Sequence, residues 1–167
     1  SDNSAISVSV SDQSLAKGFS GSVSVSSLAK SQTLEFSGFS GKNISVNKGT
    51  INIDFGSWNA SNFVTNANKS TQSIVISEAN NTLSGLAAAL NDLSGVNATV
   101  TDKGDGTFSL IVNSDTGTKN ALRLRVVEDG SDAGLATFDT SSSNSSRQVV
   151  AAQNANLNLN GVQISRE

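Results

Sequence analysis

The sequence predicts a mainly β protein: two small β-rich lobes of antiparallel strands with one short amphipathic helix. Apolar and polar residues alternate in several runs, which is typical of strands because neighbouring side chains point to opposite faces of a sheet. Turn residues separate these runs, and one segment instead has the three- and four-residue spacing of a helix. A chain of 167 residues can bury a core either as one moderate domain or as two small lobes.

Alternating runs occur along the whole chain and predict half-buried strands. The first has Ile6, Val8 and Val10 separated by serines. The others are Val23-Val25, Ile51-Ile53-Phe55, Val96-Ala98-Val100, Phe108-Leu110-Val112 and Leu122-Leu124-Val126, with Ile74-Val75-Ile76 as a shorter, more buried run. Repeated alternation favours antiparallel sheets with one solvated face.

One segment, near residues 82–94, is predicted to be a helix. Its apolar residues fall on one helical face: Leu83, Leu86, Ala87, Leu90 and Leu93. Asn81 or Thr82 can cap its start, and Gly95 can end it in a left-handed conformation. A second, weaker helical signal lies between Val149 and Asn154.

Two turns predict hairpins. Asp102-Lys103-Gly104-Asp105-Gly106 contains an Asp-Gly pair that favours a tight turn, so segments 96–101 and 107–113 should pair antiparallel. Asn160-Gly161 lies between two short apolar runs and predicts a hairpin at the C-terminal end.

Two polar stretches suggest how the lobes are arranged. The stretch from Thr137 to Ser146 is almost entirely Ser, Thr, Asn and Asp after Phe138, which predicts a mobile loop or linker. Asn59 to Ser73 is interpreted as a long strand connection. Residues 1–37 and 148–167 are therefore expected to form a first, discontinuous lobe, and residues 38–147 an inserted β-rich lobe that carries the helix.

Composition excludes several classes of function. Net charge is −3 and no cluster of Lys and Arg is present, so nucleic acid is not an expected partner. No apolar run approaches the ~20 residues that span a bilayer, and no membrane partner is expected. The chain has no Cys and no His, which excludes disulfides and removes the usual general base and the commonest metal ligand.

The remaining candidates for chemistry are weaker than their structural interpretations. Asp102 and Asp105 supply carboxylates of a calcium loop, but the rest of that loop is missing and turn geometry explains them. A nucleophilic serine would need a lysine as its base, and a glycosidase would need two carboxylates at a set separation. The residues considered for these roles are Lys17, Lys30, Lys119, Glu35, Asp54, Glu78 and Glu128. We predict no enzyme activity, metal or cofactor.

Trp58 and Phe63 are the candidate protein-contact residues. Tryptophan is enriched where binding energy concentrates at interfaces. The alternative is that Trp58, the only tryptophan of the chain, plugs the end of a small core.

Three segments, in order, resemble the flagellar cap protein family, also called the filament cap or hook-associated protein two. The first has the strand Gly21-Ser22-Val23-Ser24-Val25 followed by Leu28-Ala29-Lys30-Ser31-Gln32-Thr33-Leu34, which is similar to the family's Leu-Ala-x-x-Gln-x-Leu stretch. The second runs from Asn81 through the predicted helix to Val100 and continues with Asp105-Gly106, Leu110 and Ser114-Asp115-Thr116-Gly117. The third runs from Ala152 to Arg166 and resembles an Ala-Gln-Asp-Ala hairpin, with Asn154 where the family often has Asp.

The resemblance implies the head region of a protein that caps the growing bacterial flagellum outside the cell. There it would help exported flagellin to fold and insert at the filament tip. The implied partners are further copies of the cap protein, flagellin and other hook-associated proteins. Two alternatives stay open: an outer domain of flagellin, and a secreted adhesin module. The head fragment alone is expected to be monomeric, or only weakly associated, at micromolar concentration, because the long heptad pattern of the family's terminal helices does not occur in it.

Overall fold

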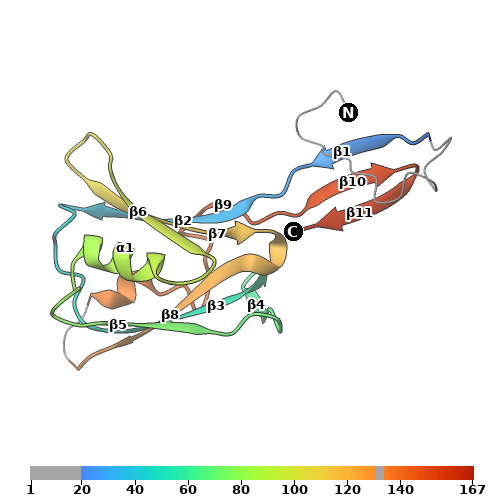
Figure 1. Ribbon diagram of the computed structural model, residues 1–167. Coiled ribbons are helices and arrows are strands. Elements are labelled where there is room, and N and C mark those ends of the chain that lie inside the picture. Colours follow the sequence, from blue (N-terminus) through green and yellow to red (C-terminus); the bar gives the residue numbers. More distant parts are fainter. Residues whose placement is uncertain (1–19, 131–133) are drawn as a thin grey trace.

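The computed structural model describes residues 20–130 and 134–167. Within these ranges it has eleven strands, one α-helix and two short 3-10 helices, so the prediction of a mainly β protein is confirmed. Figure 1 shows a two-layered body and a narrow three-stranded arm that projects from it. The predicted strand of Ile6, Val8 and Val10 lies outside the described residues.

The elements have the following bounds. The strands are β1 (Val23–Ser27), β2 (Ser31–Phe39), β3 (Gly49–Asn59), β4 (Asn62–Thr65), β5 (Gln72–Ile76), β6 (Val96–Asp102), β7 (Phe108–Thr116), β8 (Ala121–Glu128), β9 (Gln148–Val150), β10 (Ala155–Leu159) and β11 (Val162–Arg166). The helices are α1 (Leu83–Asn91), η1 (Thr118–Asn120) and η2 (Leu135–Phe138).

The body consists of two antiparallel sheets packed face to face. One sheet has the order β6-β7-β2-β9, and the predicted β6–β7 hairpin is confirmed. In the other, β8 pairs with one side of β3, while β5 and β4 pair with successive stretches of its other side. Both sheets and α1 contribute to one hydrophobic core, and Figure 1 shows α1 between the two layers.

Helix α1 begins and ends through local contacts. The Thr82 side chain accepts a hydrogen bond from the Gly85 amide at 3.0 Å, which confirms Thr82 as the N-cap. At the other end, the Asn91 side chain pairs with both backbone groups of Ala98, at 2.7 and 2.8 Å. Asn91 thereby covers part of the edge of β6, which α1 packs against.

The arm is the sheet β1-β10-β11. The predicted C-terminal hairpin is confirmed: Asn160 and Gly161 have φ of 52° and 90° in its turn, a conformation that favours Asn and Gly. Arm and body meet at Lys30, which pairs with Gln153 in an isolated antiparallel bridge. The Lys30 carbonyl accepts from the amides of Gln153 at 3.0 Å and of Gly117 at 3.2 Å. Asn154 adds a contact by accepting from the Thr118 amide at 2.7 Å.

The lobe boundaries predicted from the sequence do not coincide with the sheets. β2 and β9 belong to the segments assigned to the first lobe, and they pair with each other and with β7 in the body. The sheets divide instead at the Lys30–Gln153 bridge. The division into two lobes therefore stays a prediction.

Three strands, β2, β4 and β9, were not predicted. β2 has a fully buried Gln32 ahead of Leu34 and Phe36, so a polar residue interrupts the apolar alternation. β4 lies within the stretch interpreted as a strand connection. The helical signal between Val149 and Asn154 was wrong, because Gln148–Val150 forms β9 and pairs with β2.

The interpretation of Thr137–Ser146 as an unpacked loop was also wrong. Phe138, Thr140 and Asn144 are all buried. Phe138 packs against the rings of Phe36 and Phe39, with centroids 5.2 and 5.7 Å apart. The segment is ordered by polar contacts to the sheet as well as by Phe138.

These polar contacts cover the outer edge of β8. The Leu124 amide donates to the Thr140 hydroxyl at 2.9 Å, and the Thr140 amide donates back to the Leu124 carbonyl at 2.8 Å. The Val126 amide donates to the Asp139 carboxylate at 2.8 Å, and the Leu122 amide to the Gln32 side chain at 2.7 Å. Side chains thus replace the neighbouring strand that an edge amide would otherwise bind.

We expect Thr140→Val to lower the free energy of unfolding by about 1–3 kcal/mol, because it leaves the buried Leu124 amide without an acceptor. Urea unfolding followed by circular dichroism measures this change. Thr140→Ser keeps the hydroxyl and is the matched control, expected to retain more of the stability. Equal stability of Thr140→Val and the parent protein would show that the hydroxyl does not stabilise the edge.

Candidate protein-contact surface

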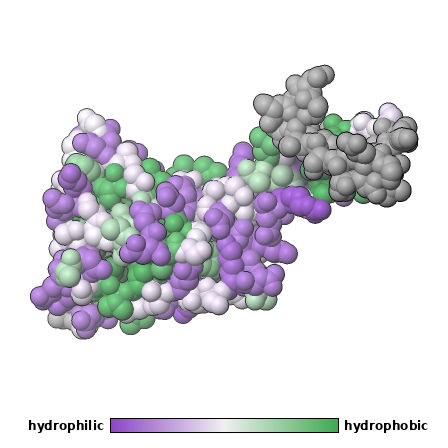
Figure 2. All heavy atoms as spheres, viewed as in Figure 1, coloured by the Kyte–Doolittle hydropathy of each residue, from purple (hydrophilic) through white to green (hydrophobic). Residues whose placement is uncertain are grey.

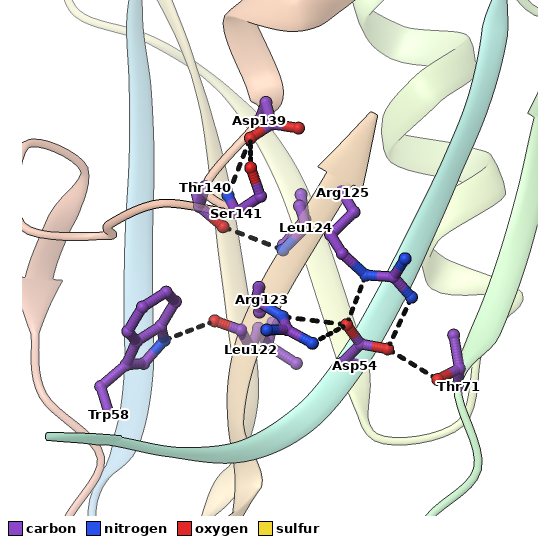
Figure 3. A network of polar contacts seen from close by, with 10 residues as sticks. All are labelled: Asp54, Trp58, Thr71, Leu122, Arg123, Leu124, Arg125, Asp139, Thr140 and Ser141. Carbon is purple, nitrogen blue, oxygen red and sulfur yellow. Dashed lines mark hydrogen bonds and ion pairs between the residues drawn. The ribbon is translucent and has the colours of Figure 1, made fainter. Parts of the chain in front are cut away.

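The outer face of the β3 sheet carries a cluster of charged residues on adjacent strands. Asp54 lies directly opposite Arg123 in the β3–β8 register, and Arg125 lies two residues further along the same face of β8. Asp54 accepts from Arg123 at 2.8 and 3.0 Å and from Arg125 at 2.7 and 3.1 Å (Figure 3). Thr71 completes the cluster by donating its hydroxyl to Asp54 at 2.6 Å.

Asp54 is an anion in this cluster although its side chain is only 3% exposed. Burial alone would raise the pKa of Asp54, but the hydrogen bonds from Arg125, Thr71 and Arg123 lower it to about 2. Two cations therefore surround one buried carboxylate, and all three charges are held on the sheet.

Trp58 and Phe63 lie beside this cluster, at the end of the sheet nearer the arm. They are opposite each other in the β3–β4 register and their rings meet edge to face, with centroids 4.9 Å apart. The Arg123 guanidinium lies 4.6 Å from the centre of the Phe63 ring. The Trp58 indole donates to the Leu122 carbonyl at 3.0 Å, across the end of β8 (Figure 3).

Gly56 allows Phe63 to lie flat against β3. A Cβ atom at Gly56 would be 2.1 Å from the Val64 carbonyl oxygen and 2.8 Å from the Phe63 ring. The backbone of β3 and the Phe63 ring therefore approach each other only because position 56 has no side chain.

Both predicted contact residues are half-buried and are brought together by the fold. Their contacts are internal, since they attach the β3–β4 hairpin to β8, but neither residue is among those that form the hydrophobic core of the body. The structure has no partner chain, so a role in protein contact stays a prediction. The neighbouring Val64 is 62% exposed and lies on the opposite face of the same hairpin.

The other carboxylates considered from the sequence lie apart, each with its own partner. Glu35 accepts from Lys103 and Ser109, both at 2.8 Å, and these bonds lower its pKa. Glu128 accepts from the amides of Ala136 and Gly134, and Glu78 lies 3.5 Å from Lys48. Among residues 20–130 and 134–167, no three potential metal-ligating side chains of His, Cys, Asp or Glu gather into a group.

The remaining candidates are explained by local structure. Asp102 and Asp105 accept from the backbone amides of Gly104 and Thr107, which is the turn geometry expected of the hairpin. Lys30 is at the junction of arm and body and Lys119 is in η1, whereas Lys17 lies outside the described residues. No helix in the part of the chain that the structure describes is long and apolar enough to cross a membrane.

Comparison with known proteins identifies the family. The chain is similar to the crystal structure of the flagellar cap protein FliD D2-D3 domains from Escherichia coli: the sequences are 34% identical and the structures have a TM-score of 0.68. The match covers 87% of this chain and 72% of that one. The chain belongs to the flagellar cap protein family.

Further matches agree with this membership in the cap family. The structure of the D1-D2-D3 domains of the same E. coli protein matches 87% of this chain and 42% of its own length, at 33% identity and a TM-score of 0.73. The curated "Flagellar hook-associated protein 2" of E. coli K12 is 43% identical over 94 residues, which is 54% of this chain. The chain spans about a fifth of the length of that relative (20%). No protein-family model matches the chain.

The structure gives the cap-family motifs physical roles. In Leu28-Ala29-Lys30-Ser31-Gln32-Thr33-Leu34, Lys30 forms the junction bridge and Gln32 the buried contact to β8. The second motif forms α1 and β6, and the third forms the β10–β11 hairpin. In the sequence, Gln32 was recognised only as part of a motif. Its position two residues before Leu34 and four before Phe36, on the same side of an extended segment, was the available signal.

Asp54→Asn should lower stability at neutral pH and should matter less in acid. Because the pKa of Asp54 is lower in the folded than in the unfolded chain, its charge stabilises the fold above the unfolded pKa, and this stabilisation is lost as pH falls toward about 2. The lowering corresponds to about 2 kcal/mol at pH 7. Urea unfolding of variant and parent between pH 7 and 2.5 should show a difference that shrinks below about pH 4.

Asp129→Asn, the same change at an exposed residue of the same region, is the control for this experiment. The free energies of unfolding of Asp129→Asn and of the parent protein should be similar throughout this pH range. A pH-independent effect of Asp54→Asn would contradict the assigned role of the carboxylate charge.

Gly56→Ala should destabilise the β3–β4 hairpin by about 1–3 kcal/mol, because its Cβ atom forces Phe63 and the Val64 backbone away from β3. Fluorescence of Trp58, the only tryptophan, should change with it because the indole packs on Phe63. Gly41→Ala is the control, since its Cβ atom would meet only the Ile44 side chain at 3.6 Å. An unchanged tryptophan spectrum in Gly56→Ala would refute the packing of Phe63 over this glycine.

Proposed function

We propose that this chain is part of the head of a flagellar cap, located outside the cell at the tip of the filament, where the whole protein helps exported flagellin to fold and insert. The match to the FliD D2-D3 domains over 87% of this chain is the observation that carries the proposal. The comparisons favour neither a flagellin outer domain nor an adhesin module. The role is structural and needs no enzyme activity.

The charge distribution of the body supports contacts that form and release. Asp54, Glu35 and Asp115 each pair with a basic residue of the chain itself. Because these charges are paired within the molecule, most of the remaining hydrogen-bonding groups on the surface are neutral. Such a surface binds successive subunits without a strong, lasting electrostatic attraction.

The chain also divides, in our proposal, into two lobes. The body sheets supply one hydrophobic core, and the arm strands lie outside it. The arm would belong to the lobe nearer the rest of the cap protein, and the body would be the inserted lobe. This arrangement keeps the predicted topology and moves both boundaries to the Lys30–Gln153 bridge.

The partners in this proposal are further copies of the cap protein, flagellin and other hook-associated proteins. Trp58 and Phe63 are the proposed contact residues. Trp58 and Phe63 present aromatic surface at the end of the body nearest the arm, and Arg123 lies against the Phe63 ring. Aromatic side chains next to arginine are typical of binding-energy centres at interfaces.

A chimera tests the function. Residues 20–167 replace the matching head region of the E. coli hook-associated protein 2, and filament number and length are measured by electron microscopy in a strain without its own cap gene. We expect filaments to grow, whereas a chimera with a Gly-Ser linker in place of the head should release flagellin into the medium. If both chimeras behave alike, the head region has no role in assembly.

The contact residues are tested in the same chimera. Phe63→Leu keeps an apolar side chain over Gly56, and Trp58→Phe keeps the aromatic ring, so both should fold. Filament growth that falls while the melting temperature of the isolated chain stays within a few degrees supports contact with a partner. Growth that follows the melting temperature alone shows that both residues act only within the fold.

A further inference from the structure

Two exposed valines lie on the outer face of the β3 sheet, at the end away from Trp58. Thr50 of β3 lies opposite Val75 of β5 and opposite Val127 of β8, so the three side chains share a face. Val75 is 67% exposed and Val127 is 62% exposed. The next residue of β3, Ile51, is buried in the core, which places the valines on the side away from it. Figure 2 shows hydrophobic residues at the surface of the body on the side where Figure 1 draws β5 and β8.

A surface hollow of about 250 Å³ lies beside these valines. Its lining includes both valines, with Gly49 and Thr50 of β3 between them. Sites for small molecules usually have volumes of roughly 300–1,000 Å³ and enclose most of the ligand. A hollow of this size at the surface suits one protruding aliphatic side chain of another polypeptide better than a small molecule.

Oppositely charged residues flank Val127 along β8. Arg125 is on the same face, because alternate residues of a strand share a face. Its side chain is 44% exposed, and only its Nε and Nη2 atoms bind Asp54. On the other side of Val127, the Asp129 amide donates to the Lys48 carbonyl at 3.0 Å, which continues the β3–β8 pairing by one residue. Asp129 is exposed and therefore also on the outer face.

Among the described residues, the two ends of this face carry opposite net charges. The cluster around Asp54 has two arginines for one carboxylate, which is an excess of one positive charge. At the other end, Lys48 lies 3.5 Å from Glu78 and opposite Asp129, which is an excess of one negative charge. Asp139, beyond the edge of β8, uses its carboxylate to bind the Val126 amide and Ser141.

The order of these residues along β8 is self-complementary. If β8 of a second copy lies antiparallel across this face with Val127 at the two-fold axis, position 125 of each copy is opposite position 129 of the other. Arg125 then meets Asp129 twice, and Val127 of each copy lies at the hollow of the other. Opposite charges on the two sides of a contact both attract the partners and fix their register.

The width of the face limits the strength of such a contact. Three strands measure roughly 10 Å between the outer strand axes. A stable interface buries about 800 Å² on each partner, and a face this narrow buries less. The contact therefore belongs to the weak class, which agrees with the expectation that the isolated chain is at most weakly associated at micromolar concentration.

We propose that two copies of this chain meet through the outer face of the β3 sheet, in a two-fold contact centred on Val127 with Arg125 of each copy on Asp129 of the other. The contact lies at the opposite end of the sheet from Trp58 and Phe63. The inference does not depend on the proposed cap function, because it concerns the isolated chain and is tested without filaments.

Nuclear magnetic resonance of the whole 167-residue chain, at concentrations from about 20 μM to 2 mM, tests the contact. The signals of Val75, Arg125, Val127 and Asp129 should shift with concentration, with a dissociation constant on the order of 1 mM. Val127→Asp should remove these shifts, because two carboxylates then face each other at the axis. Val64→Thr is the matched control, since Val64 is equally exposed on the opposite face, and it should keep them.

Charge exchange tests the register of the contact. Arg125→Glu and Asp129→Lys should each weaken association roughly fivefold or more, because like charges then meet across the axis. An equimolar mixture of the two variants should associate at least as strongly as the parent protein, because an acidic face then meets a basic one. Asp129→Lys and Val127→Asp leave the hydrogen bonds of Asp54 intact, so the test stands even if Arg125→Glu does not fold.

Three results would overturn the proposal. The first is a set of signals that does not change with concentration up to about 2 mM. The second is a concentration dependence that Val127→Asp leaves unchanged, which would place the contact on the arm or at Trp58 and Phe63. The third is a mixture of folded Arg125→Glu and Asp129→Lys that associates no more strongly than either variant alone.

Discussion

The buried side chain of Gln32 holds the two sheets of the body in register with each other. Its amide oxygen accepts from Leu122 of β8 in one sheet, while its amide nitrogen donates to Gln148 of β9 in the other at 2.8 Å. Its backbone amide donates to the Ser114 hydroxyl of β7. A fully buried amide has to find all of these partners, because a buried polar group without a hydrogen bond costs about 1–3 kcal/mol. Apolar packing alone would tolerate a small displacement of one sheet against the other, whereas such a displacement would break the hydrogen bonds of Gln32.

The same requirement explains why a polar segment is ordered at the edge of β8. Asp139 and Thr140 bind the edge groups of Val126 and Leu124 that no strand covers. Asn91 does the same for Ala98 on β6. Side-chain caps of this kind block the edge-to-edge pairing by which β proteins aggregate.

Most of the local structure could be predicted from the sequence, and most of the long-range structure could not. The two hairpins and α1 follow from residues close together in the chain, such as Asn160-Gly161 and Thr82. The Asp54–Arg123 pair joins residues 69 positions apart, and only the register of β3 with β8 brings them together. β2 escaped prediction because buried Gln32 interrupts its pattern. The ordered conformation around Thr140 was not predicted, because the prediction considered only the apolar surface of this segment. It did not consider the edge amides of β8, to which a hydroxyl or carboxylate can bind.

The junction at Lys30 and Gln153 makes the body exchangeable. The chain leaves the arm at one of these residues and returns at the other, and the two are bridge partners on adjacent strands. Opposed residues of an antiparallel pair lie only about 5 Å apart, a gap that a two-residue turn also spans. Evolution can therefore enlarge, shrink or replace everything between them while the arm keeps its register. The body can thus change in size or composition without any change in the strand pairing of the arm.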